Sequence, residues 1–224
     1  MKTADLLEKH TEEWRAATHH SFLQGMYDGT LEPRIFATWL EQDYLFIRNA
    51  FVAISGVLKG APRSAYQPLL QVLTTLETEL SWLEEKLRAQ NLSLSAAVLP
   101  ATSAYRDFLD SLAQLPFPAA LVSIWAIERA YWESWTHAAY GEPRHRAYVE
   151  HWTRPEFERM VSDVGTQVDT LLVGYGEYDC LTESLFQRVA HLQHDFWQMP
   201  YDAHHVPDAS EPDPSQRELP SKEQ

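Results

Sequence analysis

Two acidic residues fall on stretches of the sequence whose helical spacing is otherwise apolar. Asp43 shares a face with Leu40 and Ile47, and Glu128 shares one with Trp125 and Tyr131. A carboxylate removed from water must be paired, hydrogen-bonded or protonated. Because desolvation raises the pKa of a carboxyl group, two such residues could serve as an acid and a base. The pair therefore indicates either proton transfer to a bound molecule or an internal pair that serves only the fold.

Gln193 is a third polar residue on an apolar face, in line with Phe186, Val189 and Phe196. Several aromatic residues could wall a pocket beside these three: Tyr44, Phe46, Tyr105, Tyr131 and Trp135. Plain core packing is the alternative for the aromatic residues, and a satisfied core amide is the alternative for Gln193. Two inward carboxylates with aromatic walls suit a basic heterocycle, where one binds a ring nitrogen and an amine and the other transfers protons.

The elements that position these residues all show the helical period. We expect helices over residues 4–24, 34–59, 65–89, 102–114, 118–140, 155–172 and 181–199. In 65–89 the leucines form the buried stripe, and the Glu and Lys residues are expected outside it. No stretch shows the alternation typical of a strand. The sequence predicts an all-α fold, a single multi-helix bundle over residues 1–201, whose site is built from inward side chains of facing helices.

Composition changes at the C-terminus and limits the classes of partner. Residues 202–224 are rich in Pro, Ser and charge, which predicts a disordered polar tail in which His204 and His205 are solvated. The formal net charge of −14 argues against nucleic acid and anionic membranes, which require basic surface. No apolar run has the length of a transmembrane helix. Cys180 is the single cysteine, so no intrachain disulfide forms, and we expect a cytoplasmic protein.

Several short motifs occur in an order that resembles one known family. They are His20-Ser21-Phe22, Gly29-Thr30-Leu31, FATWLEQDYLF at 36–46, SAYRDFL around Tyr105, ERAYWESW at 128–135, PEF at 155–157 and HDFWQMPYD at 194–202. This order resembles the TenA / thiaminase II family, relatives of PqqC with a heme-oxygenase-like all-α fold. The resemblance implies a small-molecule pyrimidine ligand and a homo-oligomer, either a dimer or a tetramer. It also implies that Asp43 binds the aminopyrimidine and that Phe46 and Tyr105 line the pocket.

The sequence departs from the family pattern at two positions. The nucleophilic cysteine of thiaminase II would fall near Ser123 or Ile124, and Gln193 stands where the family has a glutamate on the last helix. A cysteine-less branch of the family is similar through its ExxY motif, here Glu128 and Tyr131. The resemblance to this branch implies hydrolysis of an aminopyrimidine in thiamin salvage, without a cofactor, with Glu128 and Asp43 as the catalytic residues.

Two other functions stay open. The first is a metal-dependent oxidase, for which His191 and Asp195 have a workable ligand spacing on the last helix, or a cofactor-free oxidase of the PqqC kind. Gln198 occupies the position where a third ligand would help, and Glu77 and Glu84 complete no ligand set, so we expect no metal site. The second is a non-catalytic pyrimidine-binding or regulatory protein that has kept Asp43 and lost the family's cysteine and glutamate.

Overall fold

The computed structural model describes residues 1–138, 141, 143–173 and 176–205, and within them the chain is helical with no strand. The all-α prediction is thus confirmed. The helices are α1 (Thr3–Lys9), α2 (Thr11–Thr18), α3 (Ser21–Asp28), α4 (Pro33–Gly60), α5 (Tyr66–Ala89), α6 (Pro100–Ser111), α7 (Phe117–His137), α8 (Arg146–Trp152), α9 (Pro155–Leu172) and α10 (Asp179–His204). None of the helices in these ranges combines the length and apolar character that a membrane span requires.

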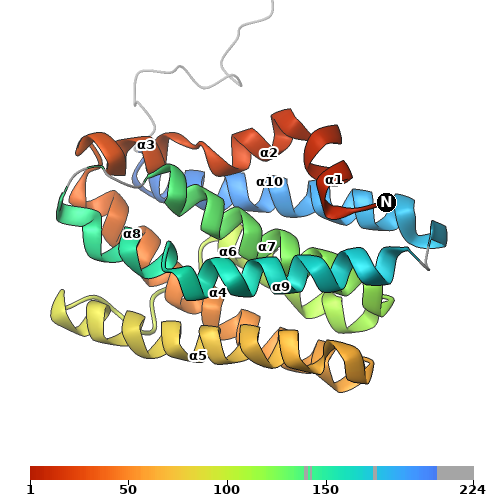
Figure 1. Ribbon diagram of the computed structural model, residues 1–224. Coiled ribbons are helices and arrows are strands. Elements are labelled where there is room, and N and C mark those ends of the chain that lie inside the picture. The colour runs from red at the N-terminus through yellow and green to blue at the C-terminus, as the bar shows by residue number, and fades with distance from the viewer. Residues whose placement is uncertain (139–140, 142, 174–175, 206–224) are drawn as a thin grey trace, which may run out of the picture.

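Helix α7 is the central element of the bundle. It packs against α10, α9, α2 and α8, while α4 packs against α5 and α6. Figure 1 shows α7, α9 and α10 running side by side, with α2 along one edge and α5 along the opposite edge. Most α7 side chains from Pro118 to Trp135 are buried, as its apolar residues on nearly all sides require. Inward polar groups on α4, α5, α7 and α10 therefore share one interior.

The prediction of one helix over residues 4–24 is wrong, because the structure has three short helices there. His10 separates α1 from α2, and α3 begins after His20, whose Nδ1 accepts a hydrogen bond from the backbone N–H of Phe22 at 3.1 Å. Such a cap satisfies a backbone donor that a helix start leaves without a partner. The apolar period continues across these breaks because each short helix buries one face against the same core.

Two differences near the ends of elements affect the site region. Helix α8 was not predicted, because its seven residues are too few to show a period, yet it buries Trp152 completely. Helix α10 passes through the buried Pro200 and ends at His204, whose Nε2 lies 2.8 Å from the Thr38 hydroxyl. His204 is therefore not a solvated tail residue. Of the predicted tail, residues 206–224 lie outside the described residues.

Gly141 lies where the chain leaves no room for a side chain. A Cβ on Gly141 would stand 2.4 Å from both Cα and the carbonyl oxygen of Tyr27, whereas a Cβ on Gly60 would meet nothing within 4 Å. Because backbone atoms cannot move aside cheaply, we expect Gly141→Ala to reduce the free energy of unfolding by about 2 kcal/mol. Gly60→Ala should be neutral or slightly stabilising in urea denaturation. Equal stability of the two variants would contradict this prediction.

Candidate active site

Three acidic side chains from three helices are buried together in the interior. Asp43 on α4 is 0% exposed, Glu79 on α5 is 2% exposed and Glu128 on α7 is 5% exposed. Tyr131 donates a hydrogen bond from its hydroxyl to Oδ1 of Asp43, and Oδ2 of Asp43 has no hydrogen-bond partner in the described part of the chain. We call Asp43, Glu79 and Glu128 the carboxyl cluster.

Burial changes the acid strength of the whole carboxyl cluster. Desolvation raises the pKa of Asp43 to about 8, against the hydrogen bond from Tyr131, and it raises the pKa of Glu128 to about 8. The pKa of Glu79 is raised well above its usual value by desolvation and then by the neighbouring charge of Glu128. All three groups therefore hold protons at a pH where exposed carboxyls are fully ionised.

One cation lies at the edge of the carboxyl cluster. Nη2 of Arg154, just before α9, is 3.8 Å from Oε1 of Glu79, which is too long for a hydrogen bond. Arg154 donates from Nη1 to the backbone carbonyl of His151, which fixes its position. Arg154 lowers the pKa of Glu79, but the effects of desolvation and of Glu128 are larger. Oε1 of Glu79 has no hydrogen-bond partner among the described residues.

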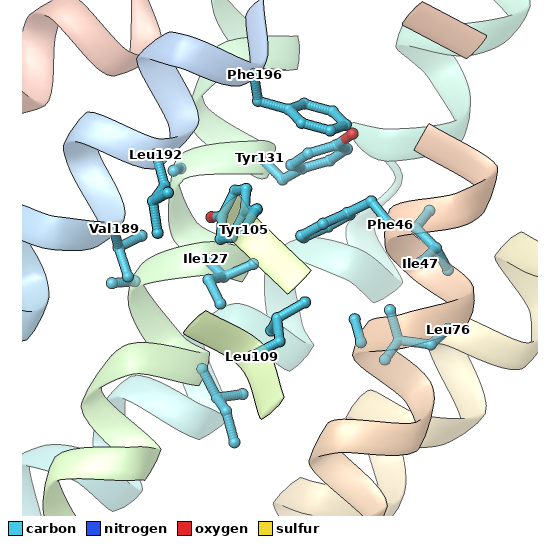
Figure 2. Close-up of a cluster of buried hydrophobic side chains, with 14 of the residues drawn as sticks. Phe46, Ile47, Leu76, Tyr105, Leu109, Ile127, Tyr131, Val189, Leu192 and Phe196 are labelled. Atoms are coloured by element: carbon cyan, nitrogen blue, oxygen red, sulfur yellow. The ribbon is translucent and has the colours of Figure 1, made fainter. Parts of the chain in front are cut away.

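Four aromatic rings pack together beside the cluster. The ring of Phe46 lies 4.7 Å from that of Tyr105, 5.3 Å from Phe196 and 6.4 Å from Tyr131, measured between centroids. Figure 2 shows these four rings, which come from α4, α6, α7 and α10, close together in the buried cluster. The Tyr105 hydroxyl donates to Oε1 of Gln193 at 3.4 Å, and the pKa of Tyr105 is raised by burial and by the charge of Glu128.

The structure brings most of the predicted site residues together and leaves two outside. Asp43, Phe46, Tyr105, Glu128, Tyr131 and Gln193 are joined by the ring contacts, hydrogen bonds and electrostatic effects just described. Tyr44 points to α5 instead, where its hydroxyl lies 3.3 Å from Oε1 of Glu84. Trp135 stacks on Trp152 at 4.5 Å and approaches Trp39 at 5.4 Å. Trp152 lies between Trp135 and the site, because its ring contacts that of Tyr131 at 5.9 Å.

Glu79 is the member of the cluster that the sequence pattern did not predict. The expectation that every Glu of residues 65–89 lies outside the buried stripe is wrong for this residue. The signal was present, since Val72, Leu76, Glu79 and Leu83 follow the four-three-four spacing of one helical face. The leucine stripe of the same helix is longer and shares Leu76 and Leu83 with this series, so it hid the position of Glu79. Trp152, whose indole favours the ionised form of Glu79, was missed together with α8.

The unpartnered polar atoms show what this interior can accept. Buried polar groups are nearly always hydrogen-bonded, yet Asp43 Oδ2, Glu79 Oε1 and Gln193 Nε2 have no partner in the described chain. Oε1 of Glu79 can accept a hydrogen bond, Nε2 of Gln193 can donate one, and Oδ2 of Asp43 can donate one when it carries the proton. A flat ligand with N–H groups and ring nitrogens offers partners of both kinds. Within the described residues, no three His, Cys, Asp or Glu side chains are arranged to hold a metal ion.

Comparison with known proteins matches nearly the whole described chain. The model of the TENA/THI-4/PQQC family matches residues 7–203. A soybean (Glycine max) protein described as "Probable bifunctional TENA-E protein" is 33% identical over 143 residues, which is 60% of this chain and 62% of that protein. The aminopyrimidine aminohydrolase of Halalkalibacterium halodurans is 27% identical over 222 aligned residues, covering 88% of this chain and 94% of that enzyme.

Solved structures agree with the fold. A TenA homologue from Pyrococcus furiosus superposes with a TM-score of 0.85 at 24% identity, covering 90% of this chain and 100% of that one. A TenA homologue from P. horikoshii superposes with a TM-score of 0.81 at 18% identity, covering 89% and 98% of the two chains. The bundle is therefore the heme-oxygenase-like fold of TenA homologues.

Proposed function

Because the chain belongs to the TENA/THI-4/PQQC family, we propose that it hydrolyses an aminopyrimidine in thiamin salvage with carboxyl groups in place of a cysteine nucleophile. The observation that carries this proposal is the buried carboxyl cluster, two of whose oxygens have no hydrogen-bond partner among the described residues. The similarity to an aminopyrimidine aminohydrolase along most of both chains supports it. Cys180 is exposed and lies on α10, away from the cluster, so it takes no part.

Asp43 would bind the amino-pyrimidine edge. With its pKa raised to about 8, the side chain is a carboxylic acid at neutral pH, having one hydroxyl and one carbonyl oxygen. Tyr131 already donates to Oδ1, so the proton belongs on Oδ2, the oxygen without a partner. Oδ2 would donate to a ring nitrogen while Oδ1 accepts from the exocyclic amine. This paired pattern matches the edge of an aminopyrimidine.

Glu128 would be the general acid and base. A carboxyl group with a pKa of about 8 can both give and take a proton near neutrality. The protonated amine would leave as the neutral amine when its bond to the methylene carbon breaks, and water would form the new bond to that carbon. The attacking water would give its extra proton to the Glu128 carboxylate, which would pass it to the departed amine. The products are the hydroxymethyl-pyrimidine and the free amine, and the enzyme recovers its starting protonation.

The test is turnover of a small panel, followed by mass spectrometry. We expect the wild type to convert aminomethyl-aminopyrimidine to hydroxymethyl-pyrimidine, and Asp43→Ala to lose at least about a hundredfold in kcat/KM, because alanine presents neither the donor nor the acceptor. The panel would include thiamin and the N-formyl derivative of the substrate. Absence of product from all three compounds would overturn the hydrolase proposal and favour the binding protein or the oxidase.

We further propose that the protein works in the cytoplasm as a homo-oligomer, either a dimer or a tetramer. The family resemblance supports the assembly. The single cysteine, Cys180, is compatible with a reducing compartment, and the net charge of −14 disfavours nucleic acid and anionic membranes as partners.

A further inference from the structure

Glu79 has no role in the hydrolysis outlined above, although it is as deeply buried as the two residues that do. A buried carboxyl is expensive, and a glutamine of similar shape would avoid most of the cost. Its Oε1 has no hydrogen-bond partner among the described residues, and the nearby guanidinium of Arg154 stops at 3.8 Å. Glu79 therefore presents an acceptor oxygen that the described protein leaves unused.

The charges of both other carboxyls act on Glu79. Each raises its pKa, and Glu128 does so more strongly than Asp43. If Asp43 binds the pyrimidine edge and Glu128 acts on the departing amine, Glu79 is the carboxyl left to bind that amine.

Binding of a cation beside Glu79 requires its carboxyl to ionise. The groups that act on Glu79 are Asp43 from α4, Glu128 and Tyr131 from α7, Trp152 from α8 and Arg154 before α9. Arg154 is the only cation among them, and its side chain is 24% exposed. An ammonium group carries three N–H donors and one positive charge, so it could fill the free position on Oε1 and balance the carboxylate.

We propose that Glu79 is the specificity-determining residue that binds the substrate's amine as an ammonium ion, so that the site prefers cationic aminomethyl-pyrimidines to neutral ones. This inference rests on the proposed function, because it takes the pyrimidine position from Asp43. Glu79 would distinguish a charged amine from a neutral group, which neither Asp43 nor Glu128 does. The N-acylated amine and the hydroxymethyl product are neutral and lack the charge that Glu79 would recognise.

The test compares binding of two ligands by isothermal titration calorimetry at pH 7. The ligands are aminomethyl-aminopyrimidine and its hydroxymethyl analogue, and all proteins carry Glu128→Gln so that neither ligand is consumed. Adding Glu79→Gln should reduce the preference for the amine at least about tenfold while the affinity for the hydroxymethyl compound changes less than threefold. Glu77→Gln, an exposed position two residues away on α5, is the matched control and should change neither affinity.

Two outcomes would overturn the assignment. An unchanged preference in the Glu79→Gln protein would show that the residue does not bind the amine, and equal weakening of both ligands would show a purely structural role. If the Glu79→Gln protein does not fold, the number of protons released on ligand binding tests the proposal without that variant. Binding of the amine to the Glu128→Gln protein should release close to one proton, because Glu79 must ionise to pair with the cation, whereas the hydroxymethyl analogue should release almost none. Equal proton release with both ligands would reject the proposal.

Failure of this inference can be distinguished from failure of the proposed function. The binding preference is measured in a protein that is not expected to turn over, whereas hydrolysis is measured in the wild type. If the wild type forms product and the Glu79→Gln protein keeps the ligand preference, the hydrolase proposal stands. The assignment of Glu79 as the specificity-determining residue is then rejected. A wild type without product and with an amine preference that depends on Glu79 would instead indicate an aminopyrimidine-binding protein.

Discussion

Glu128→Gln should reduce kcat for aminomethyl-aminopyrimidine by about 10³-fold while the hydroxymethyl product still binds. Glutamine preserves the shape of a side chain that is only 5% exposed, but it cannot give or take a proton at neutral pH. The loss should therefore fall on kcat rather than on the affinity for the pyrimidine. The measurement is steady-state product formation by mass spectrometry, paired with calorimetric binding of the product.

Glu133→Gln is the control for that substitution. Glu133 lies on the same helix, is half-buried and forms an ion pair with Arg129 at 3.0 Å. It is outside the cluster, so its loss should leave kcat within about twofold of the wild type. Turnover in the Glu128→Gln variant equal to that of the wild type would remove Glu128 from the mechanism.

Asp43→Asn should make the protein more stable than the wild type at neutral and alkaline pH. In the unfolded chain the Asp43 carboxyl ionises near its usual pKa of 3.8, whereas in the folded chain it keeps its proton until about pH 8. Raising the pH through this window therefore favours the unfolded state, which binds fewer protons. At pH 7.5 the variant should be more stable by on the order of 2–4 kcal/mol, and near pH 4 the two should be nearly equal.

Urea denaturation at a series of pH values measures this difference. Burial lowers the pKa of His20 to about 4 and of His151 to about 3, so these residues reduce stability as the pH falls. They are common to both proteins and cancel in the difference between variant and wild type. Asp107→Asn, at a side chain that is 72% exposed, should not change the pH dependence. A parallel pH profile for wild type and Asp43→Asn would show that Asp43 is ionised in the folded protein.

Much of the architecture follows from the spacing of apolar residues. Pro33 begins α4 and Pro155 begins α9, because proline at a helix start loses only a donor that would have no partner. The same spacing put Asp43 and Glu128 on buried faces, and both are buried in the folded chain. A carboxylate interrupting an otherwise apolar face is a local pattern, so it can be recognised without knowing which helices meet.

The sequence by itself therefore determined an all-α bundle, two inward carboxyls and the aromatic residues around them. The tertiary structure decided that Glu79 joins those carboxyls, that Trp152 of a short helix lies against it, and that Tyr44 faces Glu84 instead of the interior. Helical periodicity shows which face of a helix is buried, but not which residues of other helices lie opposite. Whether an acidic residue meets water, a cation or another carboxyl depends on how the helices pack, and only the folded chain contains that information.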